Sequence, residues 1–144
     1  MIYRKNPIHT TVSLEAAIAK HSADEVSTYK TVSGQHLLLA CFYPPDYRQE
    51  QRYPAIVMIH GGGWSSRKIF DYQSSWSGDY LGFLARLFAM RGFLAFSVDY
   101  RLLPDASLTD MIEDCCDAVA YIKQRFTPGT LDLLGESAGG YLAA

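Results

Sequence analysis

The stretch from Gly135 to Gly140, with the sequence GESAGG, constrains the fold of this chain more than any other. It follows the short apolar run 131–134, so it joins a buried strand to the start of a helix. Gly135 and Gly139 flank Ser137 in the pattern G-x-S-x-G, in which strand and helix pack closely around a strained serine. We therefore expect a nucleophile elbow that exposes the Ser137 hydroxyl above the sheet edge. The alternative is an ordinary left-handed turn with an idle serine.

A second glycine-rich segment, HGGGW at 60–64, directly follows the apolar run 55–59. Three consecutive glycines bury no side chain and cost backbone entropy, but they let a loop turn its N–H groups toward one point. An anionic tetrahedral intermediate needs such donors, and loss of one typically raises the barrier by about 3 kcal/mol. The alternative is a phosphate-binding loop, but the spacing fits neither G-x-G-x-x-G nor a P-loop that ends in lysine.

Composition restricts the function classes. The net charge of −2 provides no basic surface for nucleic acid, and no apolar run approaches the ~20 residues of a membrane span. The three cysteines (Cys41, Cys115 and Cys116) form neither a disulfide framework nor a metal-binding spacing. We expect reduced cysteines in a cytoplasmic protein without metal or other cofactor; a secreted protein after signal removal would look similar.

Hydrophobic periodicity predicts a leader at 1–24 followed by one domain at 25–144. An antiparallel hairpin is expected from strands at 25–33 and 36–43, and apolar strands buried on both faces are expected at 53–59 and 93–98. The segment 65–78 could line a substrate pocket, because it follows the carboxyl end of a strand.

Two helices are expected, at 79–91 and 108–126. Arg86 lies near the C-terminal end of the first and suits its dipole. Ser107 and Asp110 fit an N-cap with an acid three residues on, at the start of the second. The acids Glu113, Asp114 and Asp117 are expected largely on the solvated face of that helix, since no histidine accompanies them as a metal ligand.

The fold class is therefore α/β, with a mostly parallel sheet that opens with an antiparallel hairpin and is incomplete after the elbow. Three motifs in order, at 60–64, 97–102 and 135–140, resemble those of α/β-hydrolase esterases, in particular the hormone-sensitive-lipase-like and feruloyl-esterase-like carboxylesterases. The resemblance runs from about Val26 to the last residue. It implies hydrolysis of a small-molecule ester through a Ser-His-Asp/Glu triad.

By motif match, the resemblance implies that Ser137 is the nucleophile. It implies an oxyanion hole made of the N–H groups of Ala138, Gly62 and Gly63. Trp64 and His60 are candidate pocket residues, and Trp64 is a candidate further donor. Asp99 is expected to hold local loop structure, because the acid of the resembling family follows the serine in the chain.

The chain departs from that family after Ser137. No histidine follows His60, and no acid follows Glu136. Because a serine without a base is a poor nucleophile, we expect this chain alone to be inactive. Its expected partner is the missing C-terminal half, or a second copy bound through the open sheet edge. Two other hypotheses remain: a non-catalytic remnant that binds a partner or ligand, and an amidase or peptidase of the same superfamily.

Overall fold

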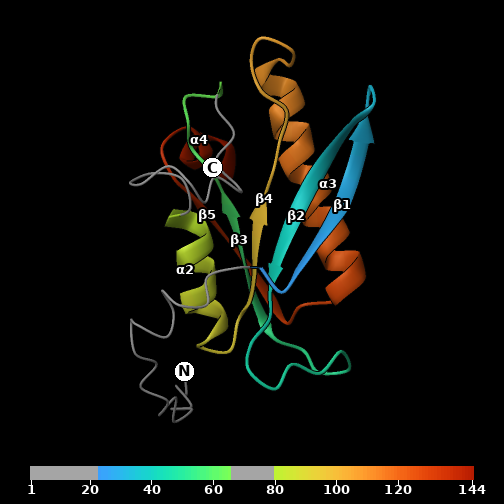
Figure 1. Ribbon diagram of the computed structural model, residues 1–144, viewed down its shortest axis with the longest axis vertical. Coiled ribbons are helices and arrows are strands. Elements are labelled where there is room, and N and C mark those ends of the chain that lie inside the picture. The colour runs from blue at the N-terminus through green and yellow to red at the C-terminus, as the bar shows by residue number, and fades with distance from the viewer. Residues whose placement is uncertain (1–22, 66–79) are drawn as a thin grey trace.

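The computed structural model describes residues 23–65 and 80–144, which form a five-stranded sheet with helices against both faces (Figure 1). Most of the predicted leader and nearly all of the predicted pocket segment lie outside these residues. The strands are β1 (Glu25–Val32), β2 (Gln35–Phe42), β3 (Pro54–Ile59), β4 (Leu94–Val98) and β5 (Thr130–Gly135). The helices are α2 (Tyr80–Ala89), α3 (Leu108–Phe126) and α4 (Ala138–Ala143).

The strands stand in the order β1-β2-β4-β3-β5. β1 pairs antiparallel with β2, and β2 pairs antiparallel with β4. β3 runs parallel to both of its neighbours, β4 and β5. The α/β class and the opening hairpin are thus confirmed, and the three parallel strands all end at the same edge of the sheet, where the two glycine motifs follow β3 and β5.

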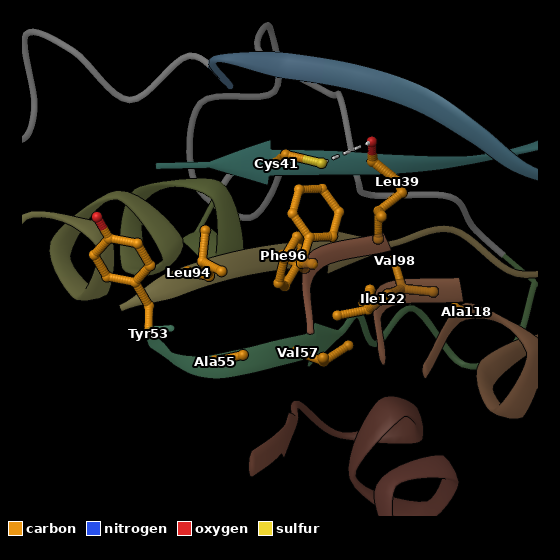
Figure 2. Close-up of a cluster of buried hydrophobic side chains, with 11 residues drawn as sticks. Leu39, Cys41, Tyr53, Ala55, Val57, Leu94, Phe96, Val98, Ala118 and Ile122 are labelled. Atoms are coloured by element: carbon orange, nitrogen blue, oxygen red, sulfur yellow. Dashed lines mark hydrogen bonds between the residues drawn. The ribbon is translucent and has the colours of Figure 1, made fainter. Parts of the chain in front are cut away.

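Alternate residues of the central strands point to opposite sides, so these apolar strands present a hydrophobic surface on both faces. A helix covers each face. On one face Ile122 and Phe126 of α3 pack against Val57 and Phe96, in the cluster drawn in Figure 2. On the other face Ala85 and Ala89 of α2 pack against side chains that include Ile56, Met58 and Ala95. β3 and β4 are therefore buried on both sides, as their continuous apolar sequences predict.

The start of α3 follows the predicted cap. The Ser107 side chain accepts a hydrogen bond from the Asp110 N–H at 3.2 Å, and the Asp110 carboxylate accepts from the Ser107 N–H at 2.8 Å. This reciprocal pair satisfies two of the N–H groups that a helix start leaves without partners. The cap sets where α3 begins, and α3 then runs across the sheet and leads into β5.

Two charged residues occupy positions that the helical patterns do not predict. Asp114, expected on the solvated face of α3, is fully buried. Arg86, expected to suit the dipole of α2, is 4% exposed; it also pairs with Asp24 at 2.9 Å and lies over the Phe42 ring. The helical patterns do not predict these positions, because the partners of Asp114 and of Arg86 come from strands and loops that are distant in the sequence.

Asp114 joins three parts of the fold. Its carboxylate accepts hydrogen bonds from Lys30 Nζ on β1 at 2.7 Å and from Arg101 Nε, in the loop after β4, at 2.8 Å. Arg101 also donates through its N–H and Nη2. Burial by itself raises the pKa of Asp114, but the hydrogen bonds from Arg101 and Lys30 outweigh it and hold the pKa below its ordinary value.

We predict that Asp114→Asn destabilises the protein by about 3 kcal/mol, because it removes a fully buried anion shared by two partly buried cationic side chains. The free energy of unfolding in urea measures this. Asp117→Asn is the matched control, since Asp117 contacts the same lysine at 2.6 Å but is 55% exposed. An exposed ion pair contributes only about 0–1 kcal/mol.

The contribution of Asp114 to the free energy of unfolding should decrease as the pH falls. Its pKa is lower in the folded than in the unfolded chain, so the stabilisation is present above the unfolded pKa of about 4 and is lost as the pH falls below it. Between pH 7 and pH 3 the stability of the wild type should therefore fall more steeply than that of Asp114→Asn. Parallel pH profiles would contradict this assignment.

Candidate active site

The two glycine motifs meet because β3 and β5 are parallel neighbours. Ile59, the last residue of β3, is in register with Gly135, the last residue of β5. The glycine loop and the serine turn therefore leave the sheet side by side. The Glu136 N–H donates a hydrogen bond to the Ile59 carbonyl at 3.1 Å, which ties the start of the turn to the strand that carries the loop.

Close backbone contacts explain why glycines stand at three of these positions. A Cβ added to Gly139 would lie 2.1 Å from the Ile59 carbonyl oxygen and 2.6 Å from that of His60. A Cβ on Gly61 would lie 2.8 Å from the Glu136 carbonyl oxygen, and one on Gly135 would lie 2.1 Å from that of Gly139. The strand, the turn and the helix can approach this closely only without side chains.

Ser137 occupies the strained conformation expected of a nucleophile elbow. Its φ is 52° and its ψ is −117°, a region that costs a non-glycine residue roughly 1–3 kcal/mol. The neighbouring backbone holds it there: the Gly139 N–H donates to the Glu136 carbonyl at 2.8 Å, and the Gly140 N–H donates to the Ser137 carbonyl at 2.9 Å. Ser137 is exposed and makes no side-chain cap to α4, so its hydroxyl is not consumed by the helix.

The glycine loop reverses direction within five residues. Gly62, Gly63 and Trp64 have φ values of 113°, 60° and 59°, and the Ser65 N–H closes the turn on the Gly62 carbonyl at 3.2 Å. Glycine adopts positive φ without steric cost, but tryptophan does not. Trp64 is held there by the Leu103 N–H, which donates to its carbonyl at 2.8 Å.

The two candidate pocket residues are largely packed into the protein. His60 is 1% exposed, and its ring stacks on that of Tyr100 with centroids 4.3 Å apart. The Trp64 ring packs edge-on against Tyr141 at 6.3 Å. Its indole N–H is buried and makes no hydrogen bond within the described residues. Ser137, Ala138, Gly62 and Gly63 lie on the two segments that meet at the sheet edge.

Asp99 and Tyr100 come directly after β4. The Asp99 N–H donates to the Leu38 carbonyl at 3.0 Å, and its own carbonyl accepts from the Tyr29 hydroxyl at 2.6 Å, so its backbone anchors the loop. Tyr100 donates its hydroxyl to the His60 carbonyl at 2.7 Å, a role that the sequence analysis did not assign. The only signal was its place in the second family motif, at 97–102.

Among residues 23–65 and 80–144, His36 is the one histidine outside the glycine loop. His36 is exposed on β2, which β4 and β3 separate from β5, and its Nδ1 lies 3.0 Å from Thr31 Oγ1. Within residues 23–65 and 80–144 no group of three or more His, Cys, Asp or Glu is arranged to hold a metal ion. In the same part of the chain no helix is long and apolar enough to cross a membrane.

A partly parallel sheet with a strained serine turn against a triple-glycine loop defines the N-terminal part of an α/β-hydrolase fold. Solved structures agree. The esterase 2 of Thermogutta terrifontis with propionate bound superposes with a TM-score of 0.72 and 28% identity, over 86% of this chain and 45% of that one. The same esterase phosphonylated by cyclosarin superposes with a TM-score of 0.70 and 29% identity, over 83% of this chain and 44% of that one.

The family model described as BD-FAE matches residues 41–144. The chain therefore belongs to the BD-FAE family of α/β-hydrolase esterases, which confirms the resemblance that the three motifs predict. It is 35% identical over 135 residues to the non-reducing polyketide synthase pkbA of Emericella nidulans, covering 85% of this chain and 5% of that protein.

A shorter match links the chain to a plant protein. It is 29% identical over 96 residues to the probable isoprenylcysteine alpha-carbonyl methylesterase ICME of Oryza sativa subsp. japonica, covering 63% of this chain and 21% of that protein. The chain thus spans less than half the length of the esterase structures and a smaller share still of these two relatives.

We predict that Gly139→Ala strongly destabilises the protein, by about 3 kcal/mol, because the new methyl group collides with two main-chain carbonyls that cannot move independently. Unfolding in urea, followed by circular dichroism, measures the loss.

Gly140→Ala is the matched control one residue further along α4. A Cβ there would lie 3.4 Å from its nearest neighbour, the Gly135 carbonyl oxygen, which is an ordinary contact. Alanine also has the better helix propensity, by about 1 kcal/mol. Equal losses of stability in the two variants would show that the contact between loop and helix is not the cause.

Proposed function

We propose that this chain is the nucleophile-bearing part of a serine carboxylesterase that hydrolyses small esters. The observation that carries the proposal is the direct contact between the glycine loop and the serine turn, in which Gly139 abuts the His60 carbonyl and Gly61 abuts Glu136. Membership of an esterase family and the exposed, strained Ser137 support it. Solved structures of the Thermogutta terrifontis esterase with propionate and with butyrate bound favour esters of short acyl groups.

In the proposed reaction Ser137 Oγ attacks the carbonyl carbon of the ester while a base takes its proton. The N–H groups of Ala138, Gly62 and Gly63 stabilise the oxyanion that develops on the carbonyl oxygen, and each such donor typically contributes about 10²–10³-fold to kcat. The alcohol leaves with a proton from the same base, and water then releases the acid from the acyl-serine.

We further propose that the base and its acid come from outside these 144 residues. No histidine and no acid follow Ser137 in the sequence, the order that the triad of this fold requires. A serine that lacks the rest of its triad loses about 10⁶-fold in kcat, while an oxyanion hole with substrate binding retains about 10³–10⁴-fold over water. The 144-residue chain alone should therefore be close to inactive.

The edge of the sheet supports this interpretation. Among the described strands β5 pairs only with β3, and Leu133 on β5 is 43% exposed. An apolar groove of about 340 Å³ lies beside it, lined by residues of α3, α4 and the two strands: Ile59, Cys115, Cys116, Val119, Ala120, Lys123, Leu133 and Leu142. We propose that the C-terminal half of the hydrolase domain covers this groove, and that a second copy covers it in the 144-residue chain alone.

The reaction is tested on the complete natural protein with a fluorophosphonate probe and with p-nitrophenyl butyrate. We expect one probe molecule per chain, attached to Ser137, and no labelling or hydrolysis by Ser137→Ala. Intact-mass and peptide mass spectrometry locate the label. Ser107→Ala, which removes another exposed hydroxyl, should keep both activities.

Three outcomes would contradict the proposal. Hydrolysis that survives Ser137→Ala would exclude Ser137 as the nucleophile. A complete protein that neither reacts with the probe nor hydrolyses the ester would favour the non-catalytic alternative. A complete protein that cleaves the corresponding p-nitroanilide as fast as the ester would favour an amidase.

The open edge gives a separate prediction. At micromolar concentration the 144-residue chain should self-associate, and Leu133→Lys should weaken the association by placing a charge in the apolar groove. Sedimentation velocity measures both. Val26→Lys is the matched control, since Val26 is 49% exposed on β1 at the opposite edge of the sheet. Equal effects of the two substitutions would exclude the groove as the contact.

A further inference from the structure

The segment 100–103, which follows β4 and Asp99, contacts the glycine loop at both of its ends. The Tyr100 hydroxyl donates to the carbonyl of His60, the first residue of the loop, at 2.7 Å. The Leu103 N–H donates to the carbonyl of Trp64, the last residue of the loop, at 2.8 Å. One neighbouring segment thus donates hydrogen bonds to the residues on both sides of the three glycines, Gly61, Gly62 and Gly63.

The first of these contacts is fully enclosed. Tyr100 is completely buried and His60 is 1% exposed, with their rings stacked at an interplanar angle of 13°. Burial raises the pKa of Tyr100 above its ordinary value, so the phenol stays protonated and donates. The carbonyl that accepts this hydrogen bond is also the one against which Gly139 of the elbow packs. Tyr100 and the elbow therefore hold the same peptide group from different elements.

The segment that holds the loop is itself fixed to α3. The Arg101 guanidinium contacts both carboxylate oxygens of Asp114, at 2.8 and 3.0 Å, and its Nη2 donates to the Asp110 carbonyl at 3.2 Å. A forked contact of this kind restrains direction as well as distance. The backbone next to Tyr100 is therefore restrained by these contacts. Three adjacent glycines, by contrast, have no side chains that restrain their backbone dihedral angles.

We propose that Tyr100 is a positioning residue of the oxyanion hole, which it orients by fixing the peptide group between His60 and Gly61. This inference rests on the proposed function, because it concerns the N–H groups of Gly62 and Gly63 as donors to the oxyanion. The peptide planes that follow are tied to this one, since His60 Nδ1 lies 2.6 Å from the Gly61 carbonyl oxygen and the Ser65 N–H donates to the Gly62 carbonyl at 3.2 Å. The direction of the first plane therefore limits the directions of the next ones. Without the Tyr100 hydroxyl, the N–H groups of Gly62 and Gly63 remain present but are less well oriented toward the oxyanion.

Tyr100→Phe in the complete natural protein tests this, because it removes one oxygen and keeps the stacked ring. We expect kcat for p-nitrophenyl butyrate to fall about 10- to 100-fold with KM changed less than about twofold, since misaligned donors weaken binding of the transition state and not of the ground state. Inhibition by an alkyl boronic acid, which forms a tetrahedral adduct with the serine, should weaken by a similar factor.

Tyr29→Phe is the matched control. The Tyr29 hydroxyl also donates to a main-chain carbonyl, that of Asp99, at 2.6 Å, but Asp99 is not part of the glycine loop. Both variants leave a carbonyl without its partner, so their midpoints in urea should fall by comparable amounts. Only Tyr100→Phe should lower kcat and weaken inhibition by the boronic acid.

A second variant keeps the test decisive if Tyr100→Phe does not fold. Arg101→Lys retains the positive charge but loses the forked contact with Asp114, so kcat should fall several-fold with KM again nearly unchanged. Unchanged kcat in the folded variants, or equal kcat losses in Tyr100→Phe and Tyr29→Phe, would overturn the positioning role. A wild-type protein that neither hydrolyses the ester nor reacts with the fluorophosphonate would overturn the proposed function and this inference together.

Discussion

The contact between the backbone of α4 and the end of β3 is the constraint on which the site depends. Gly139 lies so close to the Ile59 carbonyl that no side chain fits between them. This approach sets the direction of the serine turn and holds Ser137 at a positive φ that it would not adopt in an unconstrained chain. The same contact brings the turn against the glycine loop, because that loop begins at the residue after Ile59.

A second constraint comes from buried polar groups. Asp114 connects α3 to β1 and to the loop after β4 through Lys30 and Arg101. Breaking such a contact leaves a buried charge without a partner, so the network favours one arrangement of these elements over all others. It is continuous with the site through Tyr100, the residue next to Arg101, which bonds to the start of the glycine loop. A continuous series of contacts therefore links β1 and α3 to the loop that carries the candidate donors.

The sequence predicted the elements well, because most have strong local signals. The hairpin, the apolar strands and the capped helix α3 lie within one or two residues of their expected bounds. It did not predict the partners of Asp114 and Arg86, because a helical pattern reports which residues are apolar and not which charges meet across the fold.

The sequence by itself determined that the chain carries a serine between two glycines and a triple-glycine loop, since both depend on residue type and local spacing. It also determined that within these 144 residues no histidine or acid follows the serine. Only the tertiary structure decided that these motifs touch, because that requires β3 and β5 to pair in parallel with Ile59 opposite Gly135. Only the structure revealed Tyr100 as the partner of the glycine loop, because a hydrogen bond between residues forty positions apart leaves no local pattern.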